Sequence, residues 1–212
     1  MHDRIEFRLP RSLDNPVFRK MVMENLQQGI SYRARQLAED LAFQETLPPE
    51  PRTIAVSGAT GLIGRQVCAL LEGGGHRVLR LVRREVRSPD EISWDPQEGR
   101  LDPADLEQCD AVIHLAGHTI GGRFTAANKR RIMDSRRDGT LTVARALAEA
   151  ARDGKQRTLV SASAIGIYGA KPHSNQRASS NGVEPLDEDT RPGNDFLSRV
   201  CQVWEGACRP AR

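Results

Sequence analysis

Three regularly spaced glycines are the residues whose pattern most directly implies chemistry. An apolar run from Thr53 to Ser57 leads into Gly58-x-x-Gly61-x-x-Gly64, and a helical pattern begins at Leu62. Gly58 permits a tight turn, Gly61 lets the backbone approach a phosphate, and Gly64 lets the helix pack closely. The N–H groups of a first helical turn lack partners inside the helix, so they can donate to an anion. In this strand–helix context the spacing predicts a loop that holds the pyrophosphate of a dinucleotide.

Two arginines indicate which dinucleotide is bound. A site for NAD usually places an acidic residue at the end of the second strand, where it binds the ribose hydroxyls. The corresponding stretch here, HRVLRLVRR, contains no acid and ends in Arg83 and Arg84. A guanidinium can pair bidentately with a 2′-phosphate, so we expect NADP(H), with NAD(H) as the less favoured cofactor. The alternative is that both arginines are simply solvated.

The remaining reactive side chains do not form a metal-binding pattern. The cysteines include no CxxC pair, and His114 and His118 are expected on a strand end and a loop, so no metal site is predicted. Free thiols are typical of a reducing compartment, and we expect the cytoplasm. The cysteines are Cys68, Cys109, Cys201 and Cys208.

Composition argues against two classes of partner. The chain has 212 residues, a net charge of +3 and 38% hydrophobic residues. Its densest basic run, Lys129 to Arg137, is interleaved with acidic residues, so we expect a solvated helix face near the cofactor and no nucleic acid. The apolar runs are too short to span a bilayer and no signal-like segment opens the chain, so no membrane partner is expected.

The elements that must position the glycine loop alternate between strand and helix. Strand patterns begin at Thr53 and recur in HRVLRLVRR, CDAVIHLAG and RTLVSASA, while helical patterns cover Leu62 to Leu71 and TLTVARALAEAA. Strands separated by helices at this spacing predict an α/β fold with a doubly wound parallel sheet, that is, a Rossmann-like domain over residues 53–212. The stretch from Lys171 to Pro185 is expected to be a polar surface loop.

The first 48 residues form a different kind of segment. RIEFRLP alternates like a half-buried strand, and a long amphipathic helix is expected after Asn15-Pro16, with Gly29 as a point where it could kink. Three prolines between Leu47 and Pro51 predict a linker, which we place at residues 49–52. One strand and one helix cannot bury their own apolar faces, so this segment needs a partner.

Five motifs together resemble a known family. VSGATGLIG, AVIHLAG, KRRIMDSRRDGT, SASAIGIYG and DFLSRVCQVWEGA occur in this order. They resemble the atypical extended short-chain dehydrogenase/reductases of the NAD-dependent epimerase/dehydratase group, in the cell-division-inhibitor-like branch of the epimerase family proteins. The resemblance covers Arg52 to Arg212.

The resemblance assigns further positions. It implies that Thr60, Leu62 and Ile63 belong to the phosphate loop with the three glycines. It also implies that Leu115, Ala116 and Gly117, after His114, pass beside the cofactor. It places Ser161 and Ser163 where this superfamily presents an active-site hydroxyl to a carbonyl or carbinol group. The alternative is that both serines only satisfy local backbone groups.

The usual catalytic pair of the superfamily is missing. The resemblance implies a Tyr-x-x-x-Lys pair on the helix of DFLSRVCQVWEGA, in which tyrosinate is the general base and lysine lowers its pKa and holds the ribose. Leu197 and Cys201 occupy these two positions, and Tyr168 lies in the preceding strand-end motif. The resemblance therefore leaves the function open between an oxidoreductase or nucleoside-diphosphate-sugar epimerase, a non-catalytic dinucleotide-binding regulator or sensor, and an inactive fragment.

Both ends of the chain suggest parts of longer domains. The resemblance implies later strands and a substrate-binding region after Trp204, so we expect a sheet that is incomplete at the C-terminus. Residues 1–48 resemble the last strand and helix of a helix-grip, polyketide-cyclase-like domain. Extended members of the superfamily often dimerise through helices that flank the sheet, which makes a homodimer the expected assembly and an unidentified small molecule the expected substrate.

Overall fold

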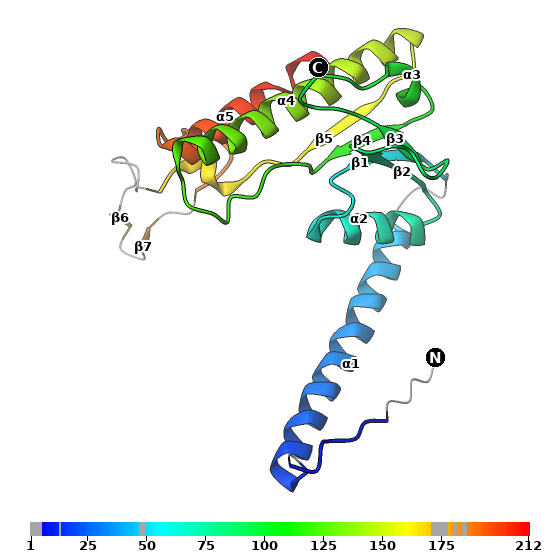
Figure 1. Cartoon of the computed structure of the whole chain (residues 1–212), viewed down its shortest axis with the longest axis vertical. Helices are drawn as coiled ribbons and strands as arrows, with labels where there is room; N and C mark the ends of the chain where they lie inside the picture. Colours follow the sequence, from blue (N-terminus) through cyan, green and yellow to red (C-terminus); the bar gives the residue numbers. More distant parts are fainter. Residues whose placement is uncertain (1–5, 13, 47–49, 171–177, 180–181, 184–185) are drawn as a thin grey trace. The chain divides into compact units, whose positions relative to one another are not determined.

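The structure is a computed structural model, and it describes residues 6–12, 14–46, 50–170, 178–179, 182–183 and 186–212 (Figure 1). Its internal contacts divide the chain into two compact units, Met1–Glu50 and Pro51–Arg212. Pro48 and Pro49, two of the three prolines from which the linker was predicted, lie outside the described residues. Each unit is described by itself below.

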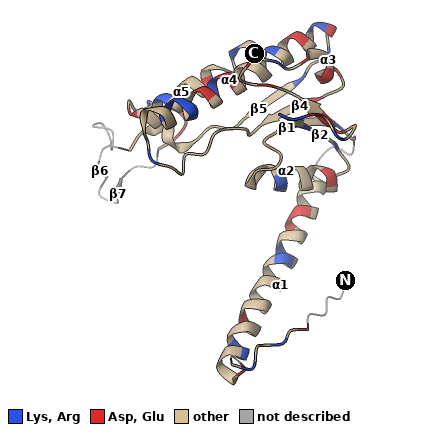
Figure 2. Cartoon of the chain, in the orientation of Figure 1, with Lys and Arg blue, Asp and Glu red and all other residues tan. Residues whose placement is uncertain are grey.

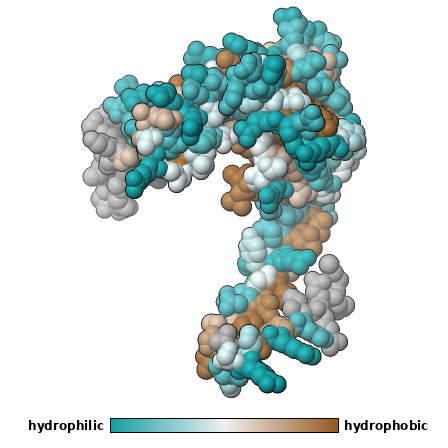
Figure 3. Space-filling view, in the orientation of Figure 1, coloured by the Kyte–Doolittle hydropathy of each residue, from teal (hydrophilic) through white to brown (hydrophobic). Residues whose placement is uncertain are grey.

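The first unit consists mainly of one long helix. Helix α1 (Pro16–Glu45) begins after Asn15, whose side chain accepts a hydrogen bond from the backbone N–H of Phe18 at 3.0 Å. It runs through Gly29 without interruption and contains no buried residue. Its apolar side chains are therefore exposed along its length (Figure 3).

The strand expected at the start of this unit is not formed in its described part. Residues 6–10 have no regular secondary structure, and Ile5 lies outside the described residues. A strand needs a neighbouring strand to pair its backbone groups, and the described residues of this unit offer only a helix. The alternation of apolar residues was therefore not sufficient to predict the conformation of residues 6–10.

The second unit is built on a parallel sheet. The five strands lie in the order β3-β2-β1-β4-β5, and every neighbouring pair is parallel. In this order β1 separates β2 from β4, so the chain direction across the sheet reverses beside the glycine loop. The strands are β1 (Thr53–Ser57), β2 (Arg77–Val82), β3 (Glu91–Ser93), β4 (Ala111–His114) and β5 (Thr158–Ser161).

Helices cover both faces of this sheet. Helix α2 (Leu62–Gly73) lies on one face, and α4 (Ala126–Ala150) lies on the other with α5 (Phe196–Gly206) packed beside it (Figure 1). The larger core, on the α4 face, includes Leu79 and Val112, and the smaller core, on the α2 face, includes Val56 and Cys68. The predicted doubly wound, Rossmann-like α/β fold is confirmed.

Several elements differ from the sequence-based expectation. Helix α4 starts at Ala126, where the Thr125 side chain caps it, so the helix face expected at Lys129 to Arg137 and the helix expected at TLTVARALAEAA belong to one continuous helix. The sequence analysis missed β3 and the short helix α3 (Pro103–Leu106). Within the expected loop, β6 (Ala178–Ser179) pairs with β7 (Gly182–Val183), while residues 171–177, 180–181 and 184–185 lie outside the described part. The described residues of this unit also form short 3₁₀ helices at Ala151–Asp153, Ile165–Tyr168 and Arg209–Ala211.

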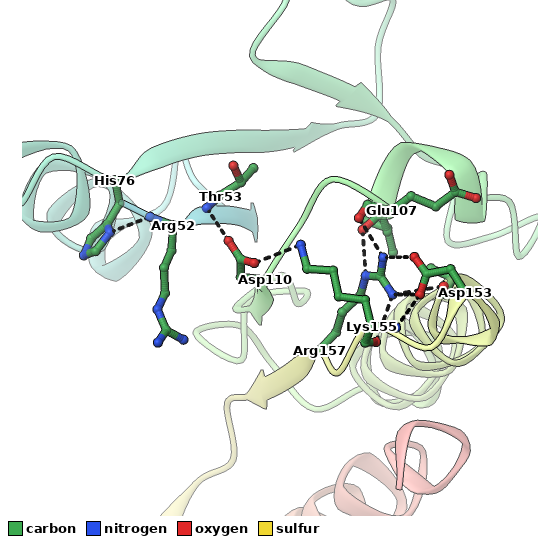
Figure 4. Close-up of polar contacts among 10 residues, drawn as sticks. Arg52, Thr53, His76, Glu107, Asp110, Asp153, Lys155 and Arg157 are labelled. Atoms are coloured by element: carbon green, nitrogen blue, oxygen red, sulfur yellow. Dashed lines mark hydrogen bonds and ion pairs between the residues drawn. The ribbon is translucent and has the colours of Figure 1, made fainter. Parts of the chain in front are cut away.

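A polar cluster joins the elements at the amino ends of the central strands (Figure 4). The Arg157 side chain has no exposed surface, and it donates to the carbonyls of Leu106 and Glu107 as well as to Asp153. Asp110 accepts from the backbone N–H of Thr53 at 2.8 Å and pairs with Lys155. These contacts tie α3, β1 and β5 together at the edge opposite the glycine loop, so we interpret them as structural.

The basic run of the sequence lies on α4, where acidic side chains alternate with it (Figure 2). Arg137 pairs with both Asp134 and Asp138. No helix among the described residues is long and apolar enough to cross a membrane.

Candidate dinucleotide-binding site

The glycine loop folds back on its own backbone. Gly58 has a φ of +72°, and a Cβ there would lie 2.9 Å from the backbone nitrogen of Ala116. A Cβ on Gly64 would lie only 2.1 Å from the carbonyl oxygen of Gly58, and one on Gly61 would lie 3.2 Å from that oxygen. Gly58 and Gly64 therefore allow the tight approach of backbone to backbone that gives the loop its shape.

The loop leaves the N-terminus of α2 open. Gly61 is its N-cap and has no side chain to accept from the first-turn N–H groups. The other α-helices in the described part of the chain begin with capping side chains, which are those of Asn15, Asp102, Thr125 and Asp195. The uncapped donors of α2, with the positive end of its dipole, can bind an anion.

Apolar side chains surround this helix start. Leu62 is 87% exposed and Ile63 is 65% exposed, although both are large aliphatic residues. Arg65 holds the loop from the outside by donating from Nε to the carbonyl oxygen of Thr60 at 2.9 Å. The structure therefore brings the loop residues of the sequence analysis together at one helix start.

A buried serine–histidine pair joins the glycine loop to the end of β4. Ser57 Oγ accepts from the backbone N–H groups of Leu115 and Ala116, at 3.1 and 3.3 Å, and lies 2.7 Å from Nδ1 of His114. Since the oxygen already accepts twice, its hydroxyl hydrogen is directed to Nδ1, and the imidazole is neutral with its proton on Nε2. Burial lowers the pKa of His114 to about 4. The sequence analysis named His114 but did not recognise Ser57 as its partner. The available signal was that each of these polar residues ends an apolar strand, Ser57 in β1 and His114 in β4.

The segment after β4 continues past Gly117 to a half-buried arginine on α4. A Cβ on Gly117 would lie 3.5 Å from the guanidinium carbon of Arg136. Arg136 Nη1 donates to the carbonyl oxygens of His118 and Ile132, at 3.0 and 3.2 Å. The sequence analysis did not single out Arg136.

The two arginines after β2 differ in their contacts. Arg84 makes two hydrogen bonds to the carboxylate of Glu91 in β3, at 2.8 and 2.6 Å, and this pairing lowers the pKa of Glu91 to about 2. Arg83 is exposed and makes no hydrogen bond or ion pair with the described residues. Of the two, Arg83 is the guanidinium available to a ligand.

The two serines after β5 also differ. Ser161 Oγ donates to the neighbouring carbonyl oxygen of Ala162 at 3.2 Å, which satisfies it locally. Ser163 Oγ donates to Oε1 of Glu205 on α5 at 2.6 Å. Glu205 follows Cys201 by one helical turn on the face that meets the β5 loop, and the sequence analysis missed it although this spacing was visible.

The helix positions of the missing tyrosine and lysine face the same loop. A Cβ on Gly166 would lie 3.4 Å from Cβ of Leu197 and 3.7 Å from Sγ of Cys201. Burial raises the pKa of the Cys201 thiol, Glu205 raises it further, and Arg136 opposes the shift. Tyr168 donates its hydroxyl to the carbonyl oxygen of Asp187, so its proton is engaged elsewhere.

These residues fit a nicotinamide dinucleotide. The open donors of α2 suit a pyrophosphate, Arg83 lies after the neighbouring strand, and Ala116 and Gly117 continue along the same carboxyl edge of the sheet. The thiols of Cys68, Cys109, Cys201 and Cys208 are free. Within the described residues, no group of three or more His, Cys, Asp and Glu side chains could hold a metal ion.

Comparison with known proteins agrees with this geometry. Residues 54–192 match the model of the NAD dependent epimerase/dehydratase family. A relative from Mycobacterium leprae, "Epimerase family protein ML0860", is 36% identical over 75% of this chain and 48% of its own length. The chain thus spans about half the length of the curated relatives it matches.

Solved structures show the same fold. The nucleoside-diphosphate sugar epimerase from Corynebacterium glutamicum is 37% identical, with a TM-score of 0.69 over 86% of this chain and 36% of that one. Human epimerase family protein SDR39U1 (isoform 2), solved with NADPH, is 26% identical, with a TM-score of 0.54 over 74% of this chain and 48% of that one. From the family match, the sheet and the glycine loop together, this chain belongs to the NAD dependent epimerase/dehydratase family as an atypical short-chain dehydrogenase/reductase.

Proposed function

We propose that this chain binds NADP(H) at the carboxyl edge of its sheet and serves a short-chain dehydrogenase/reductase-like oxidoreductase or epimerase. The observation that carries the proposal is the uncapped start of α2 behind the folded glycine loop. The NADPH bound by the human relative supports the cofactor. The name of the Corynebacterium relative supports a nucleoside-diphosphate sugar as the substrate class.

The preference for NADP(H) depends on Arg83. Its guanidinium is unpaired among the described residues, whereas Arg84 is held by Glu91. A charge-assisted contact to a 2′-phosphate is worth roughly 1.5–3 kcal/mol. We therefore expect Arg83→Ala to weaken NADPH binding by about tenfold or more and to leave NADH binding unchanged.

Isothermal titration calorimetry with both cofactors tests this preference. Arg65→Ala is a suitable control because Arg65 contacts only the outside of the loop at Thr60. Equal dissociation constants for NADPH and NADH in the unaltered chain would refute the preference, as would an unchanged NADPH affinity in Arg83→Ala.

We further propose that Ser163 and Glu205 handle the proton of the reaction. When bound, the nicotinamide supplies hydride transfer. In the oxidation direction, the substrate hydroxyl passes its proton to Ser163 Oγ as the serine proton moves along the 2.6 Å hydrogen bond to Glu205. The reverse transfer returns the proton to the product alcohol, so neither Leu197 nor Cys201 needs to act as an acid or base.

Paired variants test this role. With NADP⁺ and a panel of nucleoside-diphosphate sugars, the change in absorbance of the nicotinamide reports net oxidation, and chromatography of the sugar nucleotides reports epimerisation, which leaves the cofactor unchanged overall. Loss of one proton-transfer group costs about 10²–10⁴-fold, so Ser163→Ala and Glu205→Gln are expected to lose turnover by that order while they retain NADPH binding. Ser161→Ala is the matched control, since Ser161 donates only to its neighbouring carbonyl. Full activity in Glu205→Gln would refute the role.

A second candidate function is a non-catalytic regulator or sensor that reads bound NADP(H). It is favoured by Leu197 and Cys201 in place of the tyrosine and lysine, because neither supplies an acid or base under ordinary conditions. Tight NADPH binding without turnover of any sugar nucleotide would support this function. Four free thiols agree with a reducing compartment, and we propose the cytoplasm.

A further inference from the structure

Arg136 differs from the other partly buried arginines. In the described part of the chain, Arg80, Arg136 and Arg157 are the least exposed arginines. Arg80 pairs with Glu72 and Arg157 pairs with Asp153. Arg136 has no carboxylate partner among the described residues, although burying a cation without a partner costs free energy.

The guanidinium of Arg136 is held in place by neutral groups. Nη1 donates to two backbone carbonyls, and the guanidinium carbon lies 4.9 Å from the ring centroid of Trp204, a cation–π contact. Burial lowers the pKa of Arg136, and the thiol of Cys201 is the group that opposes this shift. The charge is therefore fixed in position without a carboxylate partner among the described residues.

Part of this guanidinium remains available to a ligand. Nε and Nη2 make no hydrogen bond within the described residues. Among the described residues, the side-chain nitrogen and oxygen atoms that are both fully buried and unpaired belong to His114, Thr140 and Trp204, so these two nitrogens of Arg136 reach solvent. A planar guanidinium with one anchored nitrogen and free donors is suited to bind oxygen atoms.

The place of Arg136 follows from the order of the strands. Along the carboxyl edge, Arg83 follows β2, the glycine loop follows β1, and Gly117 follows β4, and these three strands are neighbours in that order. Gly117 lies against the guanidinium of Arg136, and Cys201 of α5 donates to the carbonyl oxygen of Ala164 after β5. A dinucleotide with its 2′-phosphate at Arg83 and its pyrophosphate at the glycine loop would direct its second nucleotide toward β4.

We propose that Arg136 binds the ribose and phosphate oxygens of the nicotinamide-side nucleotide. It supplies from α4 the cation that Cys201, at the lysine position of α5, does not supply. This inference rests on the proposed NADP(H) binding. It assigns a binding residue on a helix that the motif-based analysis had treated as a solvated face.

The test compares a whole cofactor with half of one. NADPH contains the nicotinamide-side nucleotide, and 2′,5′-ADP contains only the adenosine side with its 2′-phosphate. Dissociation constants for both probes are measured by calorimetry for the unaltered chain and for Arg136→Gln, Arg136→Lys and Arg137→Gln. Arg137→Gln is the matched control, because it removes one charge from the next residue of α4, where Arg137 pairs with Asp134 and Asp138.

We expect Arg136→Gln to weaken NADPH binding by about tenfold or more and to leave 2′,5′-ADP binding unchanged. Arg136→Lys keeps the charge without the planar fork, so it should lose less affinity for NADPH, and it serves as the test if the glutamine variant does not fold. Arg137→Gln should bind both probes as the unaltered chain does.

Two results would overturn the inference while the proposed function stands. One is unchanged NADPH affinity in Arg136→Gln, which would show that Arg136 does not bind the cofactor. A lower unfolding midpoint in the same variant would then show that its role is structural. The other is equal weakening of both probes, which would place the effect outside the nicotinamide side. Failure of the unaltered chain to bind either probe would refute the proposed function and this inference together.

Discussion

The buried pair of Ser57 and His114 implies that the stability of this fold depends on pH. In the folded chain the His114 imidazole is fully buried, and burial lowers its pKa to about 4. In the unfolded chain the ordinary value of about 6.5 applies. As the pH falls below that value the unfolded chain takes up a proton and the folded chain does not, so the free energy of unfolding falls.

The size of this effect follows from the two pKa values. The stabilisation is fully present above about pH 6.5, and roughly 2 kcal/mol of it is lost near pH 5. Below the folded pKa of about 4 the loss levels off at about 3 kcal/mol. A protonated ring could no longer accept from Ser57 at Nδ1, so the junction between β1 and β4 would be the first contact to suffer.

Denaturant unfolding at several pH values measures this dependence. The control is His114→Asn, which offers an amide oxygen near the place of Nδ1 but does not titrate. We expect the variant to be less stable at neutral pH, because it leaves a cavity, and to lose about 2 kcal/mol less than the parent chain between about pH 8 and about pH 5. Equal losses in parent and variant, or an imidazole that titrates near its ordinary pKa by nuclear magnetic resonance, would refute the reasoning.

Other substitutions test the packing around the site. In Gly64→Ala, the new Cβ would lie 2.1 Å from the carbonyl oxygen of Gly58, so NADPH binding should be abolished. The control Gly206→Ala has open space at its Cβ and should bind NADPH normally. Calorimetry measures both affinities, and normal binding by Gly64→Ala would contradict the loop geometry. Arg157→Ala should destabilise the unit by about 3 kcal/mol in denaturant unfolding, since it removes a fully buried cation and strands its carboxylate and carbonyl partners. Ser198→Ala should cost about 1–2 kcal/mol by the same measurement, because its buried hydroxyl is shared by the carbonyls of Ile167 and Gly193; a cost near zero would contradict this role.

The sheet and the glycine loop could be predicted because their signals are local. The strand–Gly58-x-x-Gly61-x-x-Gly64–helix pattern specifies a turn and a helix start within a few residues, and the structure forms both. Apolar runs bounded by polar residues likewise mark β1, β4 and β5.

The partners of the site residues could not be predicted in the same way. Ser163 meets Glu205 across 42 positions of sequence, and Ser57 meets His114 across 57. Such contacts arise only when strands and helices pack, so the sequence named one member of each pair and not the other. Arg136 lay within a basic run, and its charge is unusual only by comparison with arginines such as Arg137 and Arg157, which have carboxylate partners in the structure.

The strand expected at Ile5 to Leu9 shows the opposite error. Its alternation of apolar residues was a genuine pattern, but a strand depends on a neighbour that the described residues of the first unit do not contain. Short elements such as β3 were missed because three residues are too few to establish a period.

The most direct test of the central claim is amide hydrogen exchange at the start of α2, with and without NADPH. The first-turn N–H groups of Leu62, Ile63 and Gly64 have no capping acceptor in the structure, so they should exchange quickly in the free chain. If this helix start holds the pyrophosphate, NADPH should slow exchange at these residues and at Gly58 to Gly61 more than elsewhere. Unchanged exchange there at a concentration of NADPH that saturates binding, or protection confined to another part of the chain, would contradict the account.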